Sequence, residues 1–253
     1  MIEFHHVCVA YSRDTVLKDI SFTVPEGSIT SLIGPNGCGK TTLLRAAAGL
    51  LPLQSGEIQL CGRSLASYDR RELARTASFM PQVRSVPAIT AGALVAHGRF
   101  PHLGFSRRMQ SKDKDAVRRA MEDTGVAQWA HRDLRELSGG ERQRVYLAMV
   151  LAQDTQVIFL DEPTTYLDLH YQFELLELIA ELNRRGKTVV MVLHDLSHAL
   201  RYSHQVVLLN EGQVVQCAPP DALWNSGQLE RVFNVQAHRT EDAYYFTHNK
   251  KDG

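Results

Sequence analysis

The stretch best suited to chemistry is a glycine-rich loop that ends in a lysine and two hydroxyls: Gly34-Pro35-Asn36-Gly37-Cys38-Gly39-Lys40-Thr41-Thr42, with the spacing G-x-x-x-x-G-K-[ST]. A backbone without Cβ can turn its N–H groups toward one point, where they hold the oxygens of a polyphosphate. Lys40 adds a charge that reaches the β and γ phosphates, and the Thr41 hydroxyl is placed to ligate magnesium. A chance match is disfavoured because a strand precedes this loop and a helix follows it.

Two adjacent carboxylates, Asp161 and Glu162, end a short apolar run at Val157 to Leu160. Neighbouring like charges indicate a bound cation or exposure to solvent, and by themselves they mean little. Downstream of a phosphate loop, they indicate the place where magnesium is held and water is activated. His194 and Gln82 follow similar runs. One histidine among eleven would ordinarily be structural, so only its position makes His194 a candidate.

A third motif, Leu137-Ser138-Gly139-Gly140-Glu141-Arg142-Gln143-Arg144, opens an apolar helical pattern. Ser138 and Glu141 have the spacing of a capping box, which satisfies the free N–H groups at a helix start. The two glycines would let a ligand approach those groups closely. Taken alone, the motif favours an anion site and a plain capped helix equally.

Short apolar runs must position these residues. We expect buried strands at Ser28 to Ile33, Thr76 to Met80, Val157 to Leu160 and Thr188 to Leu193. The carboxyl ends of parallel strands share one edge of a sheet, so the phosphate loop, Gln82, Asp161-Glu162 and His194 should converge there. Ile2 to Val9 and Leu17 to Val24 alternate in polarity and predict antiparallel strands. Tyr11 closes the first of them, where stacking on a base and ordinary packing are equally compatible with the pattern.

The rest of the chain predicts helices and one hairpin. From Val83 to about Arg135, glycines and prolines interrupt a helical insertion with helices at Ala91 to His97 and at Ser111 to Thr124, the latter capped by Ser111. Asp168 opens a helix whose apolar face is Phe173, Leu176, Ile179 and Leu182. We also expect a hairpin at Gln205 to Gln216 and helices at Pro219 to Trp224 and Gly227 to Phe233, whereas the sequence from Gln236 onward is polar and predicts no element.

The composition indicates what kind of protein this is and which partners it lacks the charge to bind. The chain has 253 residues, 44% of them hydrophobic, which is enough for a real core. Twenty-eight basic residues balance twenty-eight acidic ones. The chain therefore has no net positive charge that would favour binding to nucleic acid or to an anionic membrane. No apolar run is long enough to span a membrane, and the first residues lack a signal-peptide pattern, so we expect a cytosolic protein. The four cysteines are scattered, which predicts reduced thiols.

In this order, the phosphate loop, Gln82, Leu137 to Arg144, Asp161-Glu162 and His194 resemble the motifs of the ATP-binding cassette (ABC) ATPases, and the resemblance covers almost the whole chain. It implies an α/β fold with a RecA-like P-loop NTPase core and an antiparallel β subdomain over 1–82 and 153–235. It also implies a helical subdomain carrying the signature over 83–152 and a C-terminal tail over 236–253.

The resemblance also implies a role for each matched residue. ATP and Mg²⁺ are the expected cofactors. Tyr11 would stack on adenine, and Gly34 to Thr42 would hold the triphosphate. Thr41, Gln82 and Asp161 would organise magnesium, Glu162 would act as general base, and His194 would contact the γ-phosphate. The signature residues Ser138, Gly139, Gly140 and Glu141 would cap the ATP held by a second copy of the chain, since cassettes of this family pair head to tail.

Within the family, Gly98-Arg99-Phe100-Pro101-His102 and the loop from Asp161 to Asp168 resemble the ATPase subunits of importers for iron(III) siderophores, haem and cobalamin. This implies permease partners that dock at Val83 to Leu103, an indirect link to a solute-binding protein, and a place on the cytoplasmic face of the membrane. The alternatives are a soluble cassette ATPase acting on nucleic acid or ribosomes, the ATPase of another transporter class, and a small-molecule kinase. The balanced charge provides no basic surface typical of nucleic-acid binding. A small-molecule kinase would not need the signature motif at Leu137 to Arg144.

Overall fold

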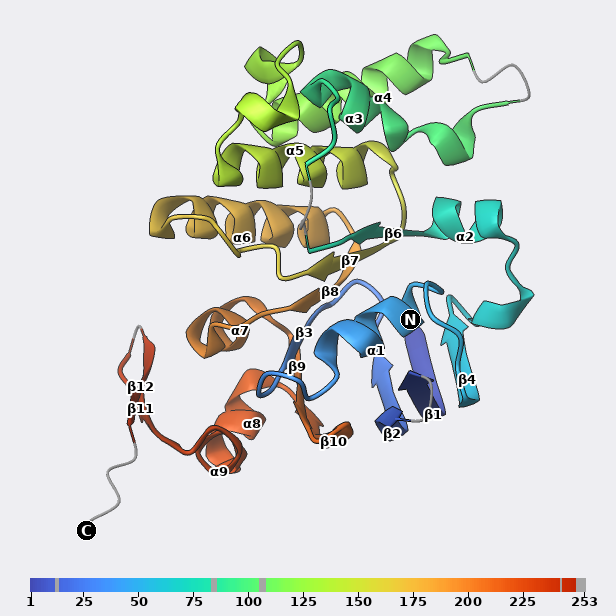
Figure 1. Ribbon diagram of the computed structural model, residues 1–253. Helices are drawn as coiled ribbons and strands as arrows, with labels where there is room; N and C mark the ends of the chain where they lie inside the picture. Colours follow the sequence, from blue (N-terminus) through green and yellow to red (C-terminus); the bar gives the residue numbers. More distant parts are fainter. Residues whose placement is uncertain (12–13, 83–85, 105–107, 242, 249–253) are drawn as a thin grey trace. The chain divides into compact units, whose positions relative to one another are not determined.

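The computed structural model describes residues 1–11, 14–82, 86–104, 108–241 and 243–248 (Figure 1). The chain divides into two compact units, residues 1–67 with 188–253, and residues 68–187. The architecture is of the predicted α/β class, with parallel strands, an antiparallel sheet and a group of packed helices. The subdomain boundaries implied by the family resemblance remain a prediction.

An antiparallel sheet begins the first unit. Its strands are β1 (Ile2–Tyr11), β2 (Asp14–Val24), β4 (Ser55–Leu60) and β5 (Arg63–Ser64), in the order β2-β1-β4-β5. A short 3₁₀ helix, η1 (Leu65–Ser67), follows β5. Ile2 pairs with Val24 and Phe4 with Phe22, whose rings stack 4.3 Å apart between centroids. The predicted antiparallel pairing of the two N-terminal strands is therefore confirmed.

A parallel group of strands forms the core of the first unit. Every residue of β3 (Ile29–Ile33) and β8 (Thr188–Val192) is buried, as expected for strands covered on both faces. β3 lies parallel to β8 on one side and to β9 (Gln205–Asn210) on the other. β10 (Gln213–Ala218) closes the predicted hairpin with β9. Helix α1 (Lys40–Ala47) follows the phosphate loop and contacts β8 (Figure 1).

The end of the chain corrects the sequence prediction. Helices α8 (Pro220–Asn225) and α9 (Gln228–Phe233) were expected, but α7 (Leu196–Tyr202) was not. Residues beyond Gln236 also form more than a polar tail, because β11 (Val235–Arg239) pairs with β12 (Tyr244–His248). The hairpin is held by aromatic packing: the ring of Trp224 lies 5.1 Å from that of Tyr244 and 6.1 Å from that of Phe246, centroid to centroid. Such long-range packing leaves no periodic signal in a polar stretch.

The second unit holds a parallel pair of strands. β6 (Ala77–Met80) follows helix α2 (Arg70–Thr76), and its register with β7 (Val157–Asp161) runs from Ala77 opposite Val157 to Met80 opposite Leu160. Helix α6 (Leu169–Arg184) follows, with Asp168 as its N-cap, as predicted. Its buried face is Leu175, Leu176, Ile179 and Leu182, whereas Phe173 is 37% exposed. The predicted face was therefore wrong at Phe173, because the buried stripe is rotated toward Leu175.

Packed helices make up the rest of the second unit. They are α3 (Ala91–His97), η2 (Phe100–His102), α4 (Ser111–Asp123), η3 (Ala127–Trp129), η4 (Leu134–Glu136) and α5 (Gly139–Ala152). Helix α5 lies along both α3 and α4 (Figure 1). The N-cap of α4 is Gln110, not Ser111 as predicted, because the carboxylate of Asp113 reaches back to the N–H of Gln110.

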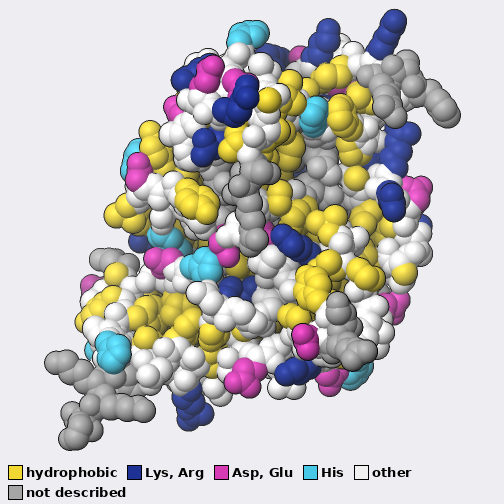
Figure 2. All heavy atoms as spheres, viewed as in Figure 1, with side chains coloured by type: hydrophobic (Ala, Val, Ile, Leu, Met, Phe, Trp, Pro, Cys, Tyr) yellow, Lys and Arg dark blue, Asp and Glu magenta, His cyan; other side chains and the backbone are white. Residues whose placement is uncertain are grey.

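The surface is mixed in charge. Figure 2 shows Lys, Arg, Asp and Glu side chains interspersed over the face in view, in keeping with 28 basic and 28 acidic residues. In the part of the chain that the structure describes, no helix has the length and apolar content to cross a membrane.

Candidate functional site

The phosphate loop leaves the end of β3 in a conformation that only glycine adopts easily. Gly34 has φ 150°, and a Cβ there would lie 2.2 Å from the carbonyl oxygen of Leu209. Gly39 has φ 104°, and its Cβ would lie 2.6 Å from Leu17 Cδ2. Backbone conformation therefore disfavours other residues at both positions, and at Gly34 the backbone carbonyl also leaves no space for a side chain. Pro35, Asn36 and Gly37 complete the turn between them.

Lys40 begins α1 and is almost fully buried, at 6% exposure. Its ammonium donates to the carbonyl oxygens of Gly34 at 2.7 Å and Pro35 at 3.0 Å. These bonds hold a positive charge against the loop and next to the N-terminal end of a helix, where the dipole also favours an anion. Thr41 is half-buried and Thr42 buried in the first turn of α1. The arrangement provides the charge and backbone donors that a polyphosphate needs.

Cys38 lies inside the loop and is buried. Burial raises the pKa of its thiol, and the neighbouring Lys40 charge only partly opposes that shift. The thiol is therefore protonated near neutral pH, which makes it a poor nucleophile.

Strand register places His194 at the same sheet edge as the phosphate loop. Leu32 of β3 lies opposite Val192 of β8 in a parallel ladder, and the N–H of Leu193 donates to the Leu32 carbonyl at 3.3 Å. His194 follows directly and is exposed. Asp195 then caps α7 by accepting from the N–H of His198 at 3.0 Å. His194 is thus fixed by a strand on one side and a capped helix on the other.

Tyr11 is the last residue of β1, opposite Asp14, and is 44% exposed. Its ring is accessible to a flat ligand, as stacking on a base requires.

In the second unit, Gln82 and the two carboxylates come together. Asp161 ends β7 and is fully buried, while Glu162 follows it at φ 54°. Gln82, two residues past β6, donates its side-chain amide to Glu162 Oε2 at 2.7 Å. The Thr165 hydroxyl donates to the same oxygen at 3.3 Å. Gln82 and Thr165 thus both orient the Glu162 carboxylate; the sequence analysis named Gln82 as a magnesium residue and gave Thr165 no role.

The signature motif forms the predicted capping box at the start of α5. The N–H of Glu141 donates to Ser138 Oγ at 3.3 Å, and the N–H of Ser138 donates to Glu141 Oε2 at 2.7 Å. This hydrogen bond from the Ser138 backbone lowers the pKa of Glu141. A Cβ on Gly139 would lie 3.4 Å from Tyr166 Cβ, and one on Gly140 would lie 3.2 Å from Leu167 Cδ2. The helix start thus packs against the segment that follows Glu162.

The candidate residues fall into two groups, one in each compact unit. The first unit carries Tyr11, the phosphate loop and His194. The second carries Gln82, Asp161-Glu162 and the signature residues Ser138 to Glu141.

The sequence analysis assigned no role to Gln143. Its side chain is 4% exposed, and its amide donates to the carbonyl oxygen of Pro163. A signal was present, because Gln143 shares a helical face with Leu147 and Val150, where a polar side chain needs a partner.

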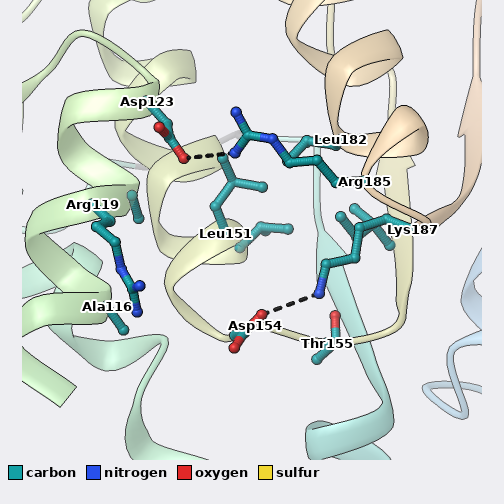
Figure 3. A pocket seen from close by; sticks show the side chains of 12 residues that line it. Ala116, Arg119, Asp123, Leu151, Asp154, Thr155, Leu182, Arg185 and Lys187 are labelled. Atoms are coloured by element: carbon teal, nitrogen blue, oxygen red, sulfur yellow. Dashed lines mark hydrogen bonds and ion pairs between the residues drawn. The ribbon is translucent and has the colours of Figure 1, made fainter. Parts of the chain in front are cut away.

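A pocket of about 260 Å³ elsewhere in the second unit contains none of the candidate residues (Figure 3). Two ion pairs border it, Arg185 with Asp123 at 3.5 Å and Lys187 with Asp154 at 3.1 Å. The apolar side chains of Leu151 and Leu182 also line it. Because its charged border is largely neutralised within the chain, we assign the pocket no function.

A phosphate loop after a buried parallel strand, adjacent carboxylates after another, and a capped Leu-Ser-Gly-Gly-Glu helix together define an ATPase of the cassette class. The sequence model described as "ABC transporter" matches residues 17–165. The chain belongs to the ABC transporter family, as an ATPase subunit coupled to transport.

Two relatives and one solved structure illustrate the similarity. The chain is 39% identical to the iron(3+)-hydroxamate import ATP-binding protein FhuC of Bacillus subtilis (strain 168), over 92% of this chain and 88% of that protein. It is 40% identical to the ferric enterobactin transport ATP-binding protein FepC of Escherichia coli (strain K12), over 92% and 87%. The dimeric post-hydrolysis structure of the ATP-binding cassette MJ0796, bound to ADP and Pi, has a TM-score of 0.77 at 26% identity, covering 87% of this chain and 99% of that one.

Proposed function

We propose that this chain is the ATP-hydrolysing subunit of an importer for iron(III)-siderophore complexes. The observation that carries the proposal is the near full-length similarity to FhuC and FepC, whose names specify iron(3+)-hydroxamate import and ferric enterobactin transport. Of the three solutes that the sequence left open, these relatives favour siderophores over haem and cobalamin.

ATP binds at Gly34 to Thr42 in this proposal, with Tyr11 stacked on the adenine. The fit is supported by Gly34 and Gly39, whose positive φ angles shape the loop backbone, and by the ammonium of Lys40 held against the loop. Thr41, Gln82 and Asp161 offer hydroxyl, amide and carboxylate oxygens, which are the hard donors that Mg²⁺ prefers. When bound, the ion neutralises charge on the phosphate oxygens.

Hydrolysis is assigned to Glu162 and His194. Glu162 accepts a proton from the attacking water, or orients that water, while Gln82 and Thr165 hold its carboxylate in one direction. His194 donates to the γ-phosphate from the end of β8. Substituting Glu162 by Gln keeps the shape and removes the base, so it should abolish turnover but preserve ATP binding.

A complete site in this proposal needs a second copy of the chain. Ser138, Gly139, Gly140 and Glu141 would contact the ATP held by the partner, through the free N–H groups at the start of α5. Gel filtration of the Glu162→Gln variant with ATP should show a dimer. A persistent monomer at saturating ATP would refute the ATP-sandwich arrangement.

Permease subunits are the second partner. The proposed docking segment is Val83 to Leu103, of which residues 83–85 lie outside the described residues. Phe100 is 58% exposed beside His97, with ring centroids 4.5 Å apart, and therefore offers an aromatic contact. Arg71 and Arg75 both donate to the carbonyl of Pro101 at 2.8 Å, which braces the segment on α2. The chain would then lie on the cytoplasmic face of the membrane, linked through the permease to a solute-binding protein.

Purification of the complex from membranes tests the assignment, because the co-purifying permease identifies the transporter. Cells that depend on this chain should lose uptake of ⁵⁵Fe-siderophore when Glu162→Gln replaces the natural chain. Unchanged uptake, or co-purification with ribosomes instead of a permease, would refute the proposal.

A further inference from the structure

One buried hydrogen bond joins the signature helix to the residue after Glu162. Gln143, in the second turn of α5, donates its side-chain amide to the carbonyl oxygen of Pro163 at 2.9 Å. Gln143 is 4% exposed, and Pro163 is also buried. Because water has little access to this bond, its donor cannot readily be replaced by solvent.

The chain at Glu162 needs such support. Glu162 has φ 54°, a conformation that costs energy in a residue with a side chain and persists only where its surroundings impose it. Within the turn, the N–H of Thr165 donates to the Glu162 carbonyl at 3.2 Å, but Pro163 itself has no N–H to contribute. The bond from Gln143 therefore fixes the peptide group between Pro163 and Thr164, one residue beyond Glu162.

Two glutamines thus hold Glu162 from different directions. Gln82 fixes its carboxylate at 2.7 Å, and Gln143 fixes the backbone one residue onward. We infer that Gln143 is a positioning residue for hydrolysis, holding the Glu162 turn from the signature helix; this rests on the proposed role of Glu162 as the base.

The expected effect is on turnover rather than on ATP binding. A general base acts through a water whose position it must match closely, so a displacement of about 1 Å is enough to slow the reaction strongly. Gln143 lies outside the phosphate loop, to which ATP binding is assigned. Its loss should therefore lower kcat and leave the KM for ATP nearly unchanged.

The test variant is Gln143→Met, which keeps the length and burial of the side chain but removes the donor. The matched control is Gln153→Met, because Gln153 at the other end of α5 also donates its amide to backbone carbonyls, those of Ala74 at 2.6 Å and Ala77 at 3.2 Å. We expect kcat to fall about tenfold in Gln143→Met, with KM within about twofold, and to stay within about twofold in Gln153→Met. Equal losses in the two variants would overturn the inference.

A double variant separates this inference from the function on which it rests. In a Glu162→Gln background, Gln143→Met should cause no further loss of the residual hydrolysis, because there is no base left to position. An additional tenfold loss there would show that Gln143 acts elsewhere and would overturn the inference. If Glu162→Gln alone retained full activity, the proposed function would fail instead.

A second substitution applies if Gln143→Met does not fold. Gln143→Glu is isosteric, and only its protonated form can donate to the Pro163 carbonyl. Its kcat, relative to the natural chain at each pH, should recover as the pH falls. A constant ratio across the pH range would contradict the role of the donor.

Discussion

A buried ion pair between Arg99 and Asp113 should contribute strongly to the stability of the second unit. Asp113 of α4 is 2% exposed and accepts from Arg99 Nε at 3.1 Å and Nη2 at 3.0 Å. Its other carboxylate oxygen accepts from the Gln110 N–H at 3.0 Å. Arg99 is also buried, and its remaining Nη1 donates to the Ala152 carbonyl at 2.8 Å. One carboxylate thus links the Arg99 segment, the start of α4 and the end of α5.

The substitution Asp113→Asn keeps the shape and removes the charge. It leaves the guanidinium of Arg99 buried without its counter-charge, and breaking one partner of a buried pair costs about 3 to 5 kcal/mol. Asp115→Asn is the matched control two residues along the same helix. Asp115 pairs with Arg118 at 3.1 Å on the surface, with its side chain 49% exposed, and such pairs contribute about 0 to 1 kcal/mol.

Urea unfolding at pH 7, followed by circular dichroism, measures both free energies of unfolding. The pH dependence gives an independent check. Burial opposes ionisation of Asp113, but the bonds from Gln110 and Arg99 outweigh it and hold the pKa below its usual value. The stabilisation is therefore present above the unfolded-state pKa of about 4 and is lost as the pH falls through the lower folded pKa. If Asp113→Asn cost no more than Asp115→Asn at pH 7, the ion-pair reasoning would be refuted.

Four further predictions concern the candidate site. Gly34→Ala should abolish ATP binding, measured with a fluorescent ATP analogue, because its Cβ would meet the Leu209 carbonyl oxygen at 2.2 Å. Lys40→Ala should weaken ATP binding in the same assay about tenfold or more, because a hydrogen bond to a charged group contributes about 1.5 to 3 kcal/mol. Ser138→Ala should cost about 1 kcal/mol in urea unfolding through loss of the helix cap, and ATPase assays should show a larger loss than the stability change explains; equal effects would leave only a structural role. Cys38→Ser should keep kcat within about twofold, and in the natural chain a thiol reagent should label exposed Cys61 well before buried Cys38.

Local pattern was sufficient for much of the fold. The short apolar runs predicted the bounds of β3, β6, β7 and β8 to within one or two residues. A strand buried on both faces is mostly apolar along its whole length, so its ends are easy to recognise in the sequence. The capping box of Ser138 and Glu141 was also readable, since cap and partner lie within one turn. Prediction was poorer where the stabilising partners are distant in sequence. The β11–β12 hairpin was not predicted, because it is stabilised by packing against Trp224.

The sequence by itself determined which residues can bind a nucleotide, because the chemistry of a phosphate loop depends on residue types at fixed spacing. It also determined that Asp161 and Glu162 lie at the end of a buried strand. Only the tertiary structure decided how Glu162 is held, since Gln82 and Gln143 reach it or its neighbour from distant parts of the chain. The physical reason is that a hydrogen bond between side chains or backbones far apart in sequence leaves no local period. It becomes visible only when the strands and helices that carry its two ends are packed together.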